Sequence, residues 1–278
     1  MPPTNAHEAT ETTAETTTAF LITKEYRRFE EFCNACRRDR YIGVCYGMPG
    51  VGKTLSARYY TRWDVLKDTD PFAFNTPVPP EIAECRTLFY TPDVTNSPRQ
   101  IKDHLETGKV LLRGVAGRAE RDRDTRASSP GFHATCELII VDEADRLKMP
   151  SLEQLRDMYD REHFGLVLVG MPGLEKRLAR YPQLYSRIGF AHTFRPLSNA
   201  EMLFVLEHHW KKIGSTLHPD DFTDQEAVAT VIRVTAGNFR LLQRLFSQIE
   251  RILKLNDLKT ITKEVVETAR DCLVIGTN

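Results

Sequence analysis

A glycine-rich octapeptide, GMPGVGKT, fits the pattern GxxxxGK[ST]. Glycines at these positions let successive backbone N–H groups turn inward around a phosphate, and the start of a following helix adds a partial positive charge. In this pattern Lys53 reaches the terminal phosphates and the Thr54 hydroxyl can bind a magnesium ion. The octapeptide therefore predicts a nucleotide site, with these candidate residues: Gly47, Met48, Pro49, Gly50, Val51, Gly52, Lys53, Thr54 and Leu55.

Two adjacent acids follow a short apolar run in the segment LIIVDE, which ends at Glu143. A buried strand that ends in an acidic residue is the expected second half of such a phosphate site. Asp142 is the candidate magnesium ligand, acting through water, and Glu143 is the candidate group that polarises the water attacking the γ-phosphate. With Glu143 and Lys53 as catalytic candidates, the pattern predicts hydrolysis of ATP with Mg²⁺ as cofactor.

The elements that must position these residues are short apolar runs that alternate with helix-like segments. Four runs cover residues 41–46, 85–90, 138–141 and 166–169, and a fifth is expected at 191–194. Fully apolar strands separated by helices indicate a parallel sheet covered on both faces. An amphipathic helix from Ile22 to about Arg38 precedes the first run.

After Pro196 the strand signals stop and helix starts take over. Capping-box patterns begin at Ser198 and Thr223, and Asn238 and Thr262 are candidate caps of two more helices. The sequence thus predicts three parts: a disordered Thr-rich tail over 1–19, an α/β ATPase domain over 20–196 and a helical lid domain over 197–278.

The composition is that of a globular chain. It has 278 residues, 41% of them hydrophobic and 27% charged, with 38 basic and 38 acidic residues. The first 19 residues hold seven Thr and three Glu but no basic or aromatic residue, so they have little to bury. No apolar run approaches the roughly 20 residues of a membrane span, and none resembles a secretory signal, so a cytoplasmic location without a membrane partner is expected.

The six cysteines are expected to be reduced thiols. Cys33 and Cys36 form a CxxC pair, for which two interpretations stay open. One is metal or redox chemistry, although no second CxxC or HxxxH follows at zinc-finger spacing. The other is a pair of thiols one turn apart on a helix.

Three segments carry a resemblance to a known family: GMPGVGKT, LIIVDEADRL and LVLVGMPGLEKRL. Over roughly residues 20–275 the chain resembles the AAA+ ATPases of DNA transposition, the TniB, TnsC and MuB group. The resemblance implies the AAA+ P-loop NTPase fold, in the α/β class, with a five-stranded parallel sheet flanked by helices and a small all-α lid. It also implies these partners: further copies of the chain in a hexameric ring or helical filament, duplex DNA, a transposase and a target-selection factor.

The resemblance assigns roles to arginines outside the two motifs. The segment TAGNFR is similar to the lid sensor of these ATPases, which implies that Arg240 contacts the nucleotide. Arg187 lies where an arginine finger from the next subunit is expected, with Arg177 and Arg180 as rivals. A finger of this kind is worth about 10³–10⁵ in rate. Ion pairs with neighbouring acids are the other interpretation of these side chains.

Two parts of the site are less well matched. The family places a polar sensor at the end of the strand after the acidic one, but Gly170 and Met171 offer no such side chain, which predicts slow hydrolysis. The adenine pocket is expected from the segment before the first strand. Tyr41 and Ile42 are its candidates, and packing explains these two residues equally well.

Basic residues are concentrated in two segments despite the zero net charge. Residues 97–134 hold eight basic and five acidic residues, and residues 230–263 hold seven basic and two acidic residues. By resemblance, the first segment faces the DNA backbone, and such phosphate contacts are nearly blind to sequence. The other interpretation of residues 113–129 is a mobile loop whose charges pair with each other. The DNA-binding candidates are Arg99, Lys102, Lys109, Arg113, Arg118 and Arg121, with Arg123 and Arg126 in the same segment.

Two classes of function remain open on the sequence alone. The first is a regulator of transposition that oligomerises on duplex DNA without sequence specificity, recruits the transposase and disassembles when ATP is hydrolysed. The second is an ATPase of the ExeA-like secretion or signalling kind that does not bind DNA. A helicase-loader type of ATPase is a further alternative. Stimulation of the ATPase by DNA distinguishes the first class from the second.

Overall fold

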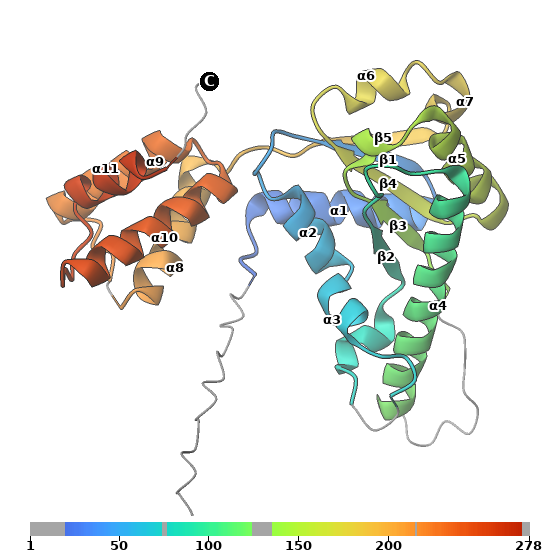
Figure 1. The fold of residues 1–278 in the computed structure, drawn as a ribbon, viewed down its shortest axis with the longest axis horizontal. Helices are drawn as coiled ribbons and strands as arrows, with labels where there is room; N and C mark the ends of the chain where they lie inside the picture. Colours follow the sequence, from blue (N-terminus) through green and yellow to red (C-terminus); the bar gives the residue numbers. More distant parts are fainter. Residues whose placement is uncertain (1–19, 74–76, 124–134, 215, 274–278) are drawn as a thin grey trace, which may run out of the picture.

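The computed structural model describes residues 20–73, 77–123, 135–214 and 216–273, so the predicted tail over 1–19 lies outside the described residues. Five strands form one sheet in the order β2-β3-β4-β1-β5, and every neighbouring pair is parallel (Figure 1). This confirms the predicted α/β fold with a five-stranded parallel sheet. The strands are β1 (Ile42–Tyr46), β2 (Thr87–Tyr90), β3 (Leu138–Val141), β4 (Gly165–Gly170) and β5 (Ile188–Thr193).

The parallel order brings the two motifs to one edge of the sheet. β4 lies between β1 and β3, with Val44 opposite Leu168 and Val141 also opposite Leu168. Because all strands run the same way, the residues after β1, β3 and β4 meet at the carboxyl edge. Gly47, Asp142 and Gly170 therefore lie close together.

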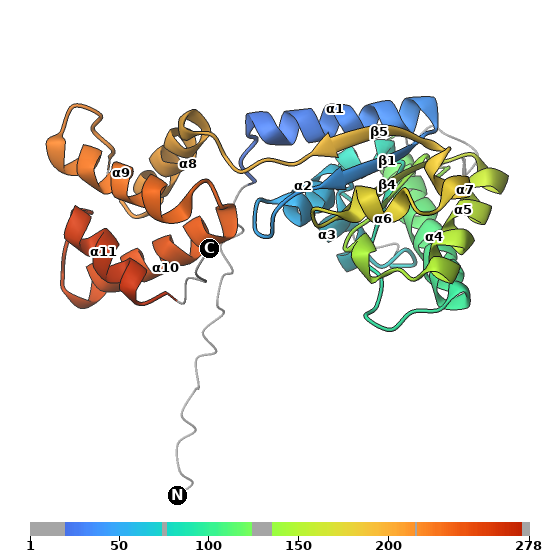
Figure 2. The ribbon, with the colours of Figure 1, turned by 90° about the horizontal axis from the view of Figure 1, so that it is seen from above.

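Helices cover both faces of the sheet (Figure 2). Phe29 and Cys33 of α1 pack on one face together with Ala57 of α2. Ile101 of α4 and Leu155 of α5 pack on the opposite face. The helices of this part are α1 (Lys24–Asp39), α2 (Lys53–Tyr60), α3 (Trp63–Asp68), α4 (Pro98–Arg123), α5 (Met149–Glu162), α6 (Leu174–Leu178) and α7 (Pro182–Tyr185), with 3-10 turns η1 (Pro80–Glu84) and η2 (Ala144–Arg146).

Four helices follow the sheet and build a core of their own, in which Trp210, Leu242 and Phe246 are almost fully buried. Figure 1 shows this group beside the sheet, joined to β5 by an extended segment. We call the group the lid. Its helices are α8 (Asn199–Lys212), α9 (Phe222–Thr235), α10 (Phe239–Leu255) and α11 (Lys263–Asp271). The exact domain boundary at residue 196 stays a prediction.

Three of the four predicted lid caps are present. Ser198 and Glu201 form a reciprocal capping box, and the side chains of Asn238 and Thr262 cap α10 and α11. The predicted cap at Thr223 is wrong. The cap and the helix start lie two residues earlier, because the Asp221 carboxylate accepts a hydrogen bond from the Thr223 N–H, at 2.7 Å, and the helix begins at Phe222.

Glu25, at the start of α1, connects the sheet to the lid. Its carboxylate accepts a hydrogen bond from the Arg195 N–H, and its own N–H donates to Glu201 on α8, at 3.0 and 2.9 Å. Burial acts to raise the pKa of Glu25, but the nearby His192 ring and the hydrogen bond from the Arg195 N–H outweigh it and hold the pKa below its usual value. Through its carboxylate and its backbone N–H, Glu25 thereby links α1, the segment after β5 and α8.

Cys33 and Cys36 are buried on the face of α1 that meets the sheet. Burial raises the pKa of both thiols, to about 12 for Cys36. Their packing favours the interpretation as core residues one turn apart. Among the described helices, none is long and apolar enough to cross a membrane.

The stability of the lid should depend on pH through His209. Burial lowers the pKa of His209 from 6.5 to about 4, and its ring stacks on Phe246 with centroids 4.4 Å apart. The folded protein keeps the ring neutral at pH 5, whereas the unfolded chain protonates it, so stability falls as the pH falls. Between pH 7 and pH 5 this group should cost about 2 kcal/mol. Urea unfolding measures the free energy of unfolding at both pH values. Between pH 7 and pH 5 the His209→Leu variant should lose about 2 kcal/mol less of this free energy than the wild type. An equal loss in both proteins would contradict the assignment.

Candidate nucleotide site

The phosphate loop between β1 and α2 has the backbone shape that its glycines predict. Gly50 and Gly52 have φ angles of +79° and +110°, in the left-handed region that favours glycine. The Lys53 ammonium donates hydrogen bonds to the carbonyls of Gly47 and Met48, at 2.6 and 2.8 Å. Burial lowers the pKa of Lys53. The loop therefore holds a partly desolvated lysine next to the place where phosphates are expected.

Asp142 and Glu143 follow β3 at the same edge of the sheet but differ in environment. Asp142 is buried, and burial raises its pKa, although a hydrogen bond from the Thr54 hydroxyl acts in the opposite direction. The Glu143 side chain is 48% exposed and forms an ion pair with Arg146. Arg146 also donates to the carbonyl of Pro92, at 3.0 Å, in the loop before α4. Asp142 is thus a fixed ligand candidate, whereas Glu143 is accessible to water.

At the end of β4, where a polar sensor side chain is expected, the polar group is the Asp145 carboxylate from the turn η2. A Cβ atom on Gly170 would lie 2.4 Å from Oδ2 of Asp145, so a side chain there would displace the Asp145 carboxylate. The same oxygen accepts a hydrogen bond from the Met171 N–H, at 2.7 Å. Arg177 on α6 donates to the backbone carbonyl of Asp145, at 2.7 Å. The sequence analysis missed Asp145, although it stands in the segment DEADRL.

The lid contacts the phosphate loop directly. The Asn238 side chain donates to the Pro49 carbonyl and the Arg240 N–H donates to the Gly50 carbonyl, both at 2.9 Å. A Cβ atom on Gly50 would lie 2.5 Å from Oδ1 of Asn238. The start of α10 is therefore seated against the loop, which brings Arg240 into the site.

A cleft of about 570 Å³ combines these parts. It is lined by Pro49, Gly50, Gly52, Lys53, Thr54, Leu55, Asp142, Glu143, Asp145, Arg146, Gly170, Met171, Phe239, Arg240 and Gln243. The structure thus brings both sequence motifs and the predicted lid arginine together around one space. Of the loop candidates, Gly47, Met48 and Val51 do not line this cleft.

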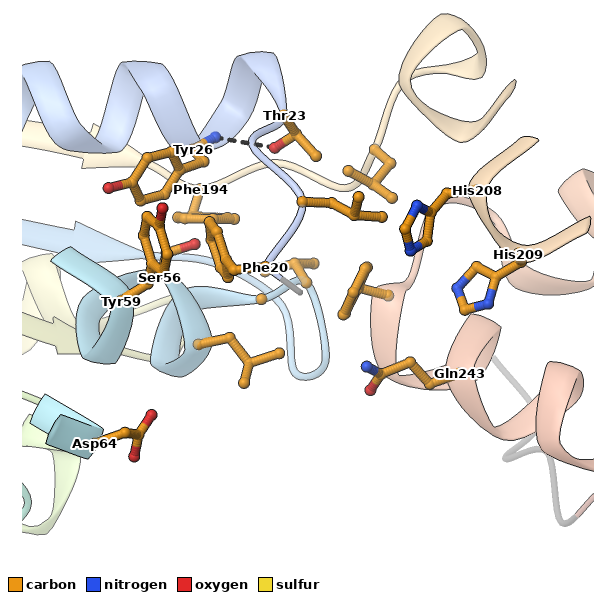
Figure 3. A pocket seen from close by; sticks show the side chains of 16 residues that line it. Phe20, Thr23, Tyr26, Ser56, Tyr59, Asp64, Phe194, His208, His209 and Gln243 are labelled. Atoms are coloured by element: carbon orange, nitrogen blue, oxygen red, sulfur yellow. Dashed lines mark hydrogen bonds between the residues drawn. The ribbon is translucent and has the colours of Figure 1, made fainter. Parts of the chain in front are cut away.

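A second, mainly apolar cavity of about 410 Å³ adjoins the cleft and shares Gly52, Leu55, Phe239 and Gln243 with it. Figure 3 shows this cavity between α2, the start of α1 and the lid. The Phe20 ring stacks on Tyr59 there, with centroids 4.0 Å apart. The apolar lining suits the ring of a nucleobase.

Tyr41 and Ile42, the predicted adenine residues, line neither this cavity nor the phosphate cleft, so the structure does not support their assignment. Ile42 starts β1, and its N–H donates to the Arg187 carbonyl at the opposite edge of the sheet from the phosphate loop. Tyr41 packs against Phe190. Both are packing residues. The residues that do line the cavity come from five stretches of the chain, at residues 20–26, 51–64, 194–197, 208–209 and 239–243.

Arg187 lies away from this chain's own nucleotide cleft. Its guanidinium makes two hydrogen bonds to the Asp160 carboxylate, at 2.6 and 2.9 Å, and lowers the pKa of Asp160. Of the rivals, Arg177 is bound to backbone carbonyls and Arg180 is exposed. A role for Arg187 toward a neighbouring subunit stays a prediction.

Two of the six candidate DNA-binding residues, Lys109 and Arg118, have buried side chains. The Lys109 ammonium pairs with Glu106 and Glu162, at 3.0 and 2.5 Å. Arg118 is 3% exposed and donates to the Asp70 carbonyl. Neither side chain is available to a DNA phosphate. The exposed candidates on α4 are Arg99, Lys102, Arg113 and Arg121.

The interpretation of residues 113–129 as a loop is wrong for its first part, because α4 continues to Arg123. Residues 124–129, with Arg126, lie outside the described residues. Arg99 stands in the first turn of α4, where the Ser97 hydroxyl accepts a hydrogen bond from the Gln100 N–H, and the Arg99 side chain is 92% exposed.

Sequence comparison matches a family profile described as an AAA domain to residues 36–178. A potential ATP-binding protein of Staphylococcus aureus is 46% identical over 269 residues, which are 92% of this chain and 97% of that protein. The ATP-dependent target DNA activator B of Escherichia phage Mu is 32% identical over 155 residues. Those residues are 53% of this chain and 42% of the phage protein, so the match spans less than half of that relative.

Comparison with solved structures finds the same architecture. The Thermotoga maritima RuvB Holliday junction branch migration motor aligns with a TM-score of 0.59 at 16% identity, over 92% of this chain and 71% of that one. The Aeropyrum pernix ORC1 protein in complex with DNA aligns with a TM-score of 0.55 at 19% identity, over 89% and 64% of the two chains. At these identities the likeness shows a shared fold.

Proposed function

The chain belongs to the AAA family of ATPases, and from that membership we propose that it is an ATP-dependent regulator of DNA transposition that assembles on duplex DNA. The observation that carries the proposal is the similarity to the ATP-dependent target DNA activator B of phage Mu. The exposed cations at the start of α4 support it, because they offer phosphate contacts that do not read sequence. Bound protein then recruits a transposase with its target-selection factor.

In the proposed site, Lys53 leaves the carbonyls of Gly47 and Met48 and binds the terminal phosphates of ATP. Its desolvation in the loop strengthens this contact, because water competes less for the ammonium. The glycine backbone N–H groups and the start of α2 bind the remaining phosphate oxygens. Arg240 approaches the same phosphates from the lid.

The residues present fit a magnesium ion. Asp142 and Thr54 offer a carboxylate and a hydroxyl that already contact each other, and oxygen ligands of this kind suit Mg²⁺. Such a site needs one or two protein ligands because phosphates and water supply the others. When bound, the ion neutralises phosphate charge. Asp142 and Thr54 are the residues that hold it.

Glu143 carries the hydrolytic step in this proposal. Its carboxylate polarises the water that attacks the γ-phosphate, and it must turn away from Arg146 to do so. Arg187 of a neighbouring copy then neutralises the charge that develops on the γ-phosphate. Turnover therefore depends on assembly. Hydrolysis weakens that contact and releases subunits from DNA.

Assembly on DNA explains how a chain of zero net charge holds a polyanion. Each copy contributes a few phosphate contacts, and many copies joined head to tail add them up. Electron microscopy with duplex DNA and a slowly hydrolysed ATP analogue tests this directly. We expect ordered rings or filaments that require both ligands. A protein that binds ATP but forms no ordered assembly on DNA at low salt would contradict the proposal.

The double variant Arg99→Ala, Lys102→Ala should weaken DNA binding about 10-fold or more at moderate salt. Two lost phosphate contacts should also reduce the slope of log affinity against log salt by about 2. Fluorescence anisotropy with labelled duplex measures both quantities, and ATP affinity should stay unchanged. Arg161→Ala is the matched control, since Arg161 is 76% exposed on α5. Wild-type affinity and slope in the double variant would exclude this surface.

A further inference from the structure

Gln243 connects the two cavities of the site. It lies on α10 three residues after Arg240, and residues three apart share a helix face. Gln243 lines both the phosphate cleft and the apolar cavity. In Figure 3 its side chain extends from the lid toward the cavity, opposite Phe20 and Tyr59. No hydrogen bond to another described residue occupies its amide.

The chemistry of the cavity makes this amide important. Phe20, Val51 and Phe194 contribute apolar surface for the faces of a base, but they cannot pair with its polar edge. A buried polar edge left without partners is costly. The Thr23 hydroxyl already accepts a hydrogen bond from the Tyr26 N–H. The Gln243 amide offers one acceptor and two donors on a short, rotatable stem.

We propose that Gln243 selects adenine by pairing with its N6 and N7 edge. The amide carbonyl accepts from the N6 amino group, and the amide nitrogen donates to N7, the pairing by which glutamine reads adenine in DNA. Guanine presents two acceptors, O6 and N7, at the same edge, so the carbonyl of Gln243 would face an oxygen. This inference rests on the proposed function, since it takes ATP as the ligand.

Because Gln243 and Arg240 lie on one face of α10, a single helix contacts the base and the phosphates. A nucleotide with another base would lose the contact to Gln243, on the same helix whose Arg240 contacts the phosphates. Gln243 thereby determines specificity without touching the reacting atoms.

Calorimetric binding of ATP, GTP and 7-deaza-ATP to the full chain tests the assignment. The wild type should bind ATP about 10-fold more tightly than GTP and should lose a similar factor with 7-deaza-ATP, which lacks N7. Gln243→Leu should weaken ATP binding about 10-fold and should no longer distinguish 7-deaza-ATP from ATP. Gln243→Arg should shift the preference toward GTP, because arginine donates to both O6 and N7.

Gln248→Leu is the matched control, because Gln248 is on the same helix and lines neither cavity. It should keep the wild-type affinities. The assignment is overturned if Gln243→Leu keeps both its affinity for ATP and its discrimination against 7-deaza-ATP. A wild-type protein that binds neither ATP nor GTP would instead overturn the proposed nucleotide site as a whole, and this inference with it.

Discussion

The Lys53→Ala variant is expected to bind ATP at least about 100-fold more weakly than the wild type and to lose assembly on DNA at the same time. The lysine supplies charged hydrogen bonds to the phosphates from a partly desolvated position, and losing two such bonds corresponds to a factor of this size. Calorimetry measures the affinity, and electron microscopy with duplex DNA measures assembly.

The fold should survive this substitution, because the hydrogen bonds of the Lys53 ammonium go to two carbonyls of the phosphate loop and not to side chains of the core. A thermal unfolding midpoint within a few degrees of the wild type serves as the check. Lys67→Ala, at a half-exposed position on α3, is the control for loss of a positive charge. ATP affinity within threefold of the wild type in Lys53→Ala would disprove the assignment of the phosphate loop.

The Glu143→Gln variant should hydrolyse ATP about 100-fold or more slowly while binding it with unchanged affinity. A glutamine keeps the size of the side chain and can still accept a hydrogen bond from Arg146, but it cannot draw a proton from water. Steady-state phosphate release gives the rate, and calorimetry gives the affinity. Because hydrolysis releases subunits in the proposed cycle, assemblies of this variant on DNA should persist in ATP.

Glu153→Gln on α5 is the matched control, since it removes another carboxylate that pairs with an arginine on its own helix. That variant should hydrolyse ATP at the wild-type rate. A folded Glu143→Gln protein that still turns over ATP normally would show that another group polarises the water. Loss of DNA binding in the Glu143→Gln variant would contradict the assignment of Glu143 to hydrolysis alone.

The parts of the site that could be predicted are those whose residues are neighbours in the sequence. An apolar run before Gly47 and another before Asp142 identify two buried strands and the turns that follow them. Parallel pairing then leaves only one edge where both turns can lie. Ser198 and Asn238 likewise identify helix starts because a cap acts within three residues.

The parts that could not be predicted depend on distant partners. The alternating charges around Arg118 are equally compatible with a loop, and its helical, buried state depends on the Asp70 carbonyl, 48 residues away. Lys109 can be buried because its ammonium pairs with Glu162. That partner lies 53 residues further along the chain, so no local pattern indicates it. Asp145 was visible in the sequence, but its place at the end of β4 follows from a contact with Met171, 26 residues away.

The apolar cavity could not be predicted either, because its lining residues are far apart in the sequence. Its lining combines Phe20, Tyr59 and Phe239, and no local pattern connects these three residues. The segment before the first strand does contribute Phe20 and Tyr26, but its predicted residues Tyr41 and Ile42 lie elsewhere. A planar ring is enclosed by surfaces from several elements, so its site appears only when those elements are placed together.

The contact between Asn238 and Pro49 joins residues that are 189 positions apart in the chain. The predicted boundary after residue 196 separates two hydrophobic cores, yet it passes through the middle of the nucleotide site. An isolated α/β part would lack the two lid donors to the phosphate loop, together with Arg240 and Gln243. In the proposed site, the unit that folds and the unit that binds nucleotide are therefore different: we expect neither half alone to bind and hydrolyse ATP as the whole chain does.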